Sequence, residues 1–112
     1  MYPSTIEFLR HIQSECEYLI KEYNSSSYEE FTGNERLSKA VCRSLEIIGE
    51  AVNKIHPDIK IQHNDIPWRE ISDLRNRIIH HYFGIDYEII WDVIENEIPI
   101  LKEQIDAIIN NH

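Results

Sequence analysis

The sequence predicts an all-α fold, an antiparallel bundle of four to five helices, and three observations support this class. Apolar residues recur at intervals of three and four along most of the chain, which is the period of an amphipathic helix. No stretch alternates apolar and polar residues as a half-buried strand would. The 3 glycines and 4 prolines fall mostly at the expected joints between helices. A chain of 112 residues suffices for one domain with a modest core, so residues 1–112 are expected to form a single domain.

The first helix is expected to begin after Ser4, because the residues from Ser4 to Glu7 fit a capping box. The polar run at residues 24–27 should end it. Residues 31–34 are expected to form a turn in which Asn34 caps the second helix. The apolar stripe of the first helix consists of Leu9, Ile12, Cys16, Leu19, Ile20 and Tyr23.

The second helix is expected to stop at Pro57, since proline disrupts a helix interior, and residues 57–66 are expected to form a loop. Its apolar stripe consists of Leu37, Val41, Leu45, Ile48, Val52 and Ile55. A third helix is expected over residues 68–82, with Pro67 at its start and Gly84 breaking it. Asp86 can cap a fourth helix, which Pro99 should kink or split in two.

The charge balance excludes a general nucleic-acid coat protein. The chain has 20 acidic and 11 basic residues, a formal net charge of -9, which repels a nucleic-acid backbone at long range. Residues 54–85 differ, with 4 acidic and 5 basic residues, whereas residues 86–112 hold 7 acidic residues and 1 basic one. The charge therefore does not exclude a local site, and the segment 54–85, which is not acidic, holds the candidate motif.

The two cysteines, Cys16 and Cys42, fall within apolar helical patterns and are expected to be buried and reduced rather than disulfide-bonded. The N-terminus has neither the basic region nor the apolar block of a signal peptide. No apolar run approaches the roughly 18 residues that a membrane-spanning helix needs. A cytoplasmic protein without a membrane association is expected.

Residues 75–82 carry the candidate chemistry, because Arg75, Asn76, His80 and Tyr82 lie within eight residues of one another. Arginine is a permanent cation whose planar fork matches phosphate oxygens. Histidine has an ordinary pKa close to neutral, so it can act as a general base or a general acid. Together they can hold a phosphodiester and transfer a proton beside it. These are the minimum requirements of a metal-independent ribonuclease.

On a continuous helix, Asn76 and His80 would be neighbours on one face, while Arg75 would lie about 140° from His80 around the axis. One copy of this pattern supplies only one histidine and one well-placed arginine. A two-fold dimer that brought two such helices together would supply two of each around one cleft. We therefore expect a homodimer with a composite site.

Other interpretations of the same residues stay open. Arginine and histidine are common near the C-terminal end of a helix, where cations interact favourably with the helix dipole. Tyr82 could simply close the helix end together with Phe83. Adjacent histidines such as His80 and His81 point to different sides of a helix, and no carboxylate or cysteine sits at a ligand spacing. No metal and no other cofactor is expected.

The chain resembles the HepT-like ribonuclease toxins, a branch of the HEPN superfamily. The signature of that family is an arginine, four residues, a histidine, one residue and a tyrosine, which Arg75, His80 and Tyr82 match in full. Asn76, directly after the arginine, matches the wider HEPN pattern. Residues 46–51, with the sequence EIIGEA, and the pair Pro67-Trp68 also resemble segments of these proteins, and the resemblance covers essentially the whole chain.

The resemblance implies a HEPN-type helical bundle that dimerises and cleaves RNA, with Arg75 and His80 catalytic and Asn76 supporting them or contacting the substrate. It also implies a toxin-antitoxin module whose partner is a minimal nucleotidyltransferase antitoxin of the MntA type. That partner would transfer AMP from ATP onto Tyr82 and silence the toxin. The added bulk and negative charge would oppose RNA entry.

HEPN folds also serve as non-catalytic subunits that pair with a nucleotidyltransferase, so fold alone cannot decide between an enzyme and a binding module. The presence of both Arg75 and His80 favours the enzyme.

Overall fold

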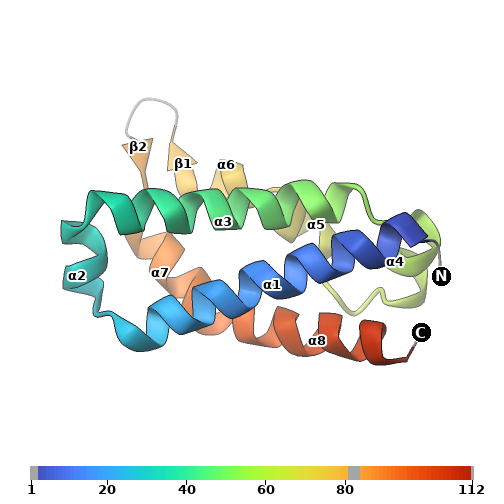
Figure 1. The fold of residues 1–112 in the computed structure, drawn as a ribbon. Helices are drawn as coiled ribbons and strands as arrows, with labels where there is room; N and C mark the ends of the chain where they lie inside the picture. Colours follow the sequence, from blue (N-terminus) through green and yellow to red (C-terminus); the bar gives the residue numbers. More distant parts are fainter. Residues whose placement is uncertain (1–2, 81–83, 112) are drawn as a thin grey trace.

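The computed structural model describes residues 3–80 and 84–111. Four helices of ten or more residues build the bundle: α1 (Pro3–Ser25), α3 (Glu35–Asn53), α7 (Tyr87–Asn96) and α8 (Ile98–Asn110). Helix α1 packs against both α3 and α8, and α3 also contacts the short helices α5 (Trp68–Ser72) and α6 (Leu74–Ile78). Figure 1 shows the beginning of α1 and the end of α8 at the same end of the bundle. The expected all-α helical bundle is confirmed.

Side chains from α1 through α8 share one apolar core. The largest fully buried members include Leu9, Ile12, Leu19, Phe31, Leu45, Ile48, Leu74, Ile78, Ile90, Ile94, Ile98 and Ile105. The stripes expected on the first and second helices supply five of these twelve residues. Among the described helices, none combines the length and the apolar composition that crossing a bilayer requires.

Several expected boundaries are confirmed with their physical cause. The Asn34 side chain accepts a hydrogen bond from the Leu37 amide and caps α3, and Asp86 accepts one from the Ile89 amide and caps α7. Helix α1 ends at Ser25, within the polar run. The fourth expected helix is split at Glu97 into α7 and α8, with Pro99 in the first turn of α8.

Three local expectations were wrong. Helix α1 already starts at Pro3, so Ser4 lies inside it and does not cap it. Residues 31–34 belong mostly to a short helix, α2 (Tyr28–Gly33), which begins with a capping box made by Ser27 and Glu30. The expected loop at 57–66 contains helix α4 (Pro57–Gln62), because Pro57 occupies its first turn, where no amide proton is needed.

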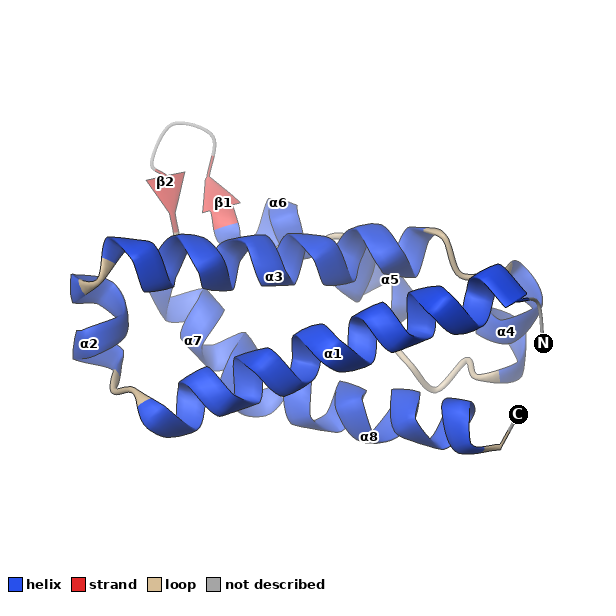
Figure 2. Cartoon of the chain, viewed as in Figure 1, coloured by secondary structure: helices blue, strands red, loops and turns tan. Residues whose placement is uncertain are grey.

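The third expected helix is the largest correction. It is divided at Asp73 into α5 and α6, and it ends at Ile78 rather than at Tyr82. Strand β1 (Ile79–His80) follows and pairs antiparallel with β2 (Gly84–Ile85), as Figure 2 shows. Ile79, whose backbone is extended, carries a β-branched side chain that suits a strand. Gly84, with a φ of 78°, adopts a conformation that side chains disfavour.

Cys16 and Cys42 are free and buried, as expected. Burial raises the pKa of the Cys16 thiol to about 12 and that of the Cys42 thiol to about 11. Both thiols are therefore protonated and unreactive at neutral pH.

Gly49 sets how closely α3 approaches the end of α5. A Cβ atom at this position would lie 3.3 Å from the carbonyl oxygens of both Ile71 and Ser72. We expect Gly49→Val to lower the free energy of unfolding by about 1–3 kcal/mol, since backbone atoms must move to admit the side chain. Urea denaturation measures this. Gly33→Ala is the matched control, because a Cβ there meets nothing within 4 Å, and an equal loss in both variants would contradict the close approach.

Candidate active site

Arg75 extends from α6 into a groove between α3 and the α5–α6 segment. The groove has a volume of about 250 Å3 and is lined by Glu46, Gly49, Glu50, Asn53, Ser72, Arg75 and Asn76. Arg75 is exposed, and it forms no ion pair with another described residue. The guanidinium of Arg43 instead lies 3.5 Å from the Glu46 carboxylate and 3.2 Å from that of Glu50. Arg75 is therefore available to an anionic ligand in this groove.

Gly49 positions this groove. Its lack of a side chain lets α3 come close to the carbonyl groups of Ile71 and Ser72, immediately before α6 begins. The segment EIIGEA thus provides both a packing contact and one wall of the groove that Arg75 lines. Sequence reasoning noticed the segment only by resemblance. The isolated glycine within a helical pattern was the physical signal of a close backbone approach.

His80 lies on strand β1, where its backbone pairs with Gly84, and not on a helix. The Asp86 amide donates to the Ile78 carbonyl at 2.8 Å and closes the end of the strand pair. The expected i,i+4 relationship of Asn76 and His80 is therefore wrong, since α6 ends between them. The same correction removes the helical angle expected between Arg75 and His80.

The Asn76 side chain is held by its own helix. Its amide Nδ2 donates a hydrogen bond of 2.6 Å to the Asp73 carboxylate, which lies at the junction of α5 and α6. Both residues are exposed, and Asn76 lines the groove. Its amide oxygen and its second N–H can therefore still reach a ligand there. The prediction that Asn76 lies beside His80 on one face of a helix was wrong.

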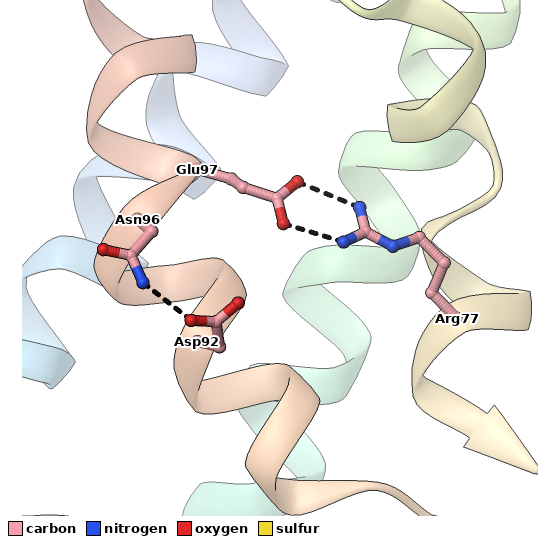
Figure 3. A network of polar contacts seen from close by, with 4 residues as sticks. All are labelled: Arg77, Asp92, Asn96 and Glu97. Atoms are coloured by element: carbon pink, nitrogen blue, oxygen red, sulfur yellow. Dashed lines mark hydrogen bonds and ion pairs between the residues drawn. The ribbon is translucent and has the colours of Figure 1, made fainter.

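Arg77 has a different role from Arg75, which lies only two residues earlier. Its guanidinium donates two hydrogen bonds to the Glu97 carboxylate, at 2.9 and 2.7 Å, and Figure 3 shows this paired geometry. The hydrogen bonds that Arg77 donates to Glu97 raise the pKa of Arg77. The ion pair fastens α6 to the junction of α7 and α8, so Arg77 positions the segment that carries Arg75.

We expect Arg77→Gln to lower the free energy of unfolding by about 1 kcal/mol, because a partly exposed ion pair of good geometry contributes about that much. The corresponding fall in the melting temperature is about 4 °C. Arg43→Gln is the control, since its carboxylate partners lie farther away and its side chain is 58% exposed against 30% for Arg77. Calorimetry that finds the two variants equally stable would contradict the fastening role.

The remaining predicted residue, Tyr82, lies outside the described residues, as does His81. Within the described ranges, no group of three or more histidine, cysteine, aspartate or glutamate side chains is arranged to hold a metal ion.

The structure thus combines an all-α bundle with an exposed arginine on α6 and a histidine on strand β1, and comparisons with known proteins assign the class to which the chain belongs. The sequence matches the family Ribonuclease HepT-like over residues 12–108. The chain belongs to this family, and the class of enzyme that the sequence predicts, a ribonuclease, is confirmed.

The chain is 44% identical to "Putative RNase TTE0752" of Caldanaerobacter subterraneus subsp. tengcongensis over 91% of each sequence. It is 40% identical to "Putative RNase MJ0127" of Methanocaldococcus jannaschii, over 93% of this chain and 86% of that protein. A third relative, "Probable ribonuclease HepT" of Thermococcus cleftensis, is 40% identical over 86% of this chain and 87% of its own length. No solved structure matches the chain significantly.

Proposed function

We propose that this protein is the toxin of a toxin-antitoxin module and that it cleaves RNA without a metal ion, with Arg75 and His80 as its catalytic residues. The observation that carries the proposal is the exposed Arg75 in a groove at the family's signature segment, with His80 five residues further on. The proposal is also supported by the ribonuclease family to which the chain belongs.

The chemistry follows from the two side chains. The 2′-hydroxyl oxygen of a ribose attacks the adjacent phosphorus, and the bond from phosphorus to the 5′-oxygen of the next nucleotide breaks. Neutral His80 takes the 2′-hydroxyl proton, and a protonated histidine gives a proton to the leaving 5′-oxygen. Arg75 donates to the phosphate oxygens as their charge increases. The products are a 2′,3′-cyclic phosphate and a 5′-hydroxyl end.

This scheme needs one histidine as a base and another as an acid in the same turnover. We propose that a homodimer supplies them, with the signature segments of two protomers facing one cleft. Two copies of Arg75 would then concentrate positive charge where the phosphate lies. That local charge offsets the net charge of -9, which otherwise weakens binding of an RNA backbone.

We further propose that the toxin is silenced by a minimal nucleotidyltransferase antitoxin of the MntA type, which transfers AMP from ATP onto Tyr82. The phenol oxygen attacks the α-phosphorus of ATP, the bond to pyrophosphate breaks, and the phenol proton is released. Each transfer adds a bulky nucleotide and one negative charge two residues from His80. Both effects oppose the entry of another phosphodiester. The protein is proposed to act in the cytoplasm, where RNA and ATP are present.

The proposal is tested with the purified chain and a fluorescently labelled RNA, in buffer with and without EDTA. Cleavage that EDTA does not reduce, with 5′-hydroxyl products, supports the scheme. Abolition of the activity by EDTA contradicts it. Light scattering at micromolar concentration tests the composite site, and the finding of monomers alone would exclude it.

A further inference from the structure

A second hollow on the molecule has a different character from the groove around Arg75. It has a volume of about 240 Å3 and is lined by Tyr28, Glu88, Trp91, Asp92 and Glu95. Tyr28 is the first residue of α2, and the other four lie on α7. In Figure 1 these two helices lie toward the end of the bundle away from the beginning of α1. We call it the aromatic–acidic pocket.

The aromatic wall of this pocket is fixed from behind. Trp91 stacks on the buried Phe31 with ring centroids 5.1 Å apart, and Tyr23 lies against it at 4.8 Å. The Tyr28 ring stands 6.0 Å from Trp91 at an interplanar angle of 56°. Tyr28 and Trp91 are both half-buried, so each keeps some surface open to a ligand. The aromatic rings of the pocket are therefore already held in place by their neighbours, and they do not have to become ordered when a ligand binds.

The charge around this wall is negative. Three of the five lining residues are carboxylates, and none is basic. They belong to residues 86–112, which contain 7 acidic residues and 1 basic one. Burial and the nearby carboxylates of Glu88, Asp86 and Glu29 raise the pKa of Tyr28. A hydrogen bond with Glu95 raises the pKa of Tyr23. The carboxylates around the pocket thus contribute to both shifts, beside burial.

We propose that the aromatic–acidic pocket receives an arginine side chain from a basic segment of a partner protein. A guanidinium can stack on an aromatic face while its N–H groups donate to carboxylates, which is the combination that Trp91, Glu88 and Asp92 offer. Aromatic rings can also stack nucleobases, but the phosphates of RNA would be repelled by the carboxylates here. The inference is independent of the proposed catalysis, because the pocket contains neither Arg75 nor His80.

The test uses NMR of the full chain with a capped peptide that contains a single arginine. The indole N–H of Trp91 is the probe, and that of Trp68 is an internal reference, since Trp68 is 8% exposed and donates to the His63 carbonyl. The same peptide with citrulline, a neutral analogue of nearly the same shape, is the ligand control. We expect a saturable shift of the Trp91 signal with the arginine peptide alone.

The double substitution Glu88→Gln and Asp92→Asn removes two charges while keeping the shape of the pocket. It should weaken peptide binding by about three- to tenfold. The matched control is Glu7→Gln with Glu103→Gln, two exposed carboxylates that do not line the pocket and whose loss changes the net charge equally. It should bind as the wild type does.

Four results would overturn the proposal. They are no shift of Trp91, an equal shift with the citrulline peptide, equal weakening by both double substitutions, or a saturable shift of Trp91 by an RNA oligonucleotide.

Discussion

His80→Ala is expected to abolish RNA cleavage, and Arg75→Ala is expected to reduce it by about a hundred- to a thousandfold. Removing the histidine removes the only group in the proposed scheme that carries protons at neutral pH. Removing the arginine takes away charge stabilisation at the phosphate, which is comparable to the loss of one oxyanion donor. The rate of cleavage of a labelled RNA under single-turnover conditions measures both.

Both substitutions should leave the fold intact. Arg75 is exposed, and it makes no ion pair with another described residue that its loss would break. Two exposed residues serve as matched controls: Arg69→Ala removes a guanidinium from α5, and His11→Ala removes an imidazole from α1. Neither lines the groove around Arg75, so both variants should cleave at the wild-type rate.

Full cleavage by His80→Ala would exclude the mechanism. If Arg69→Ala lost as much activity as Arg75→Ala, positive charge in general would be responsible, and the groove would have no special role. If the wild type itself cleaves no RNA while its fold and its partner binding are intact, the chain acts as a non-catalytic HEPN subunit.

The long helices could be predicted because their signals are local. The stripe that contains Leu45 and Ile48, the cap at Asn34 and the proline at position 99 each specify their own neighbourhood. Those signals depend on the period of the helix and on hydrogen bonding within one turn. These local signals therefore act regardless of which other helix packs against the apolar face.

The end of α6 could not be predicted in this way. The period of apolar residues continues past Ile78, and no proline or glycine interrupts it before Gly84. What ends the helix is pairing with a strand six residues further on, which no local pattern reveals. The division at Asp73 follows directly after Ile71 and Ser72, whose carbonyl oxygens lie against Gly49 of α3. The strand pairing is a tertiary effect that overrides helix propensity.

The sequence proposes residue types for the candidate site, but the helical geometry that it predicts for them was wrong. The sequence offers two arginines in this segment, Arg75 and Arg77, and spacing alone does not say which one is available. Arg77 is engaged by Glu97, which lies twenty residues further along the chain, so Arg75 is the arginine that is available to a ligand. The family signature points to Arg75, which has no ion pair with another described residue, and its catalytic role stays a prediction.

Tyr82→Phe is expected to leave RNA cleavage largely intact while making the protein insensitive to the proposed antitoxin and ATP. Phenylalanine keeps the ring and removes only the oxygen that would accept AMP. Cleavage in the proposed scheme uses Arg75 and His80, so it does not need this oxygen. Silencing needs it absolutely, because no P–O bond to the ring can form without it.

The measurement compares wild type and Tyr82→Phe after incubation with the nucleotidyltransferase and ATP. The wild type should lose RNA cleavage and gain the mass of one or more AMP groups on the peptide that contains Tyr82. Tyr87→Phe is the matched control, since Tyr87 packs edge-to-face on Phe31 and should not be an acceptor. That variant should be silenced like the wild type. If the Tyr82 peptide stays unmodified while the antitoxin still blocks cleavage, inhibition occurs by binding alone, and Tyr82 is an ordinary aromatic residue that follows the histidine pair.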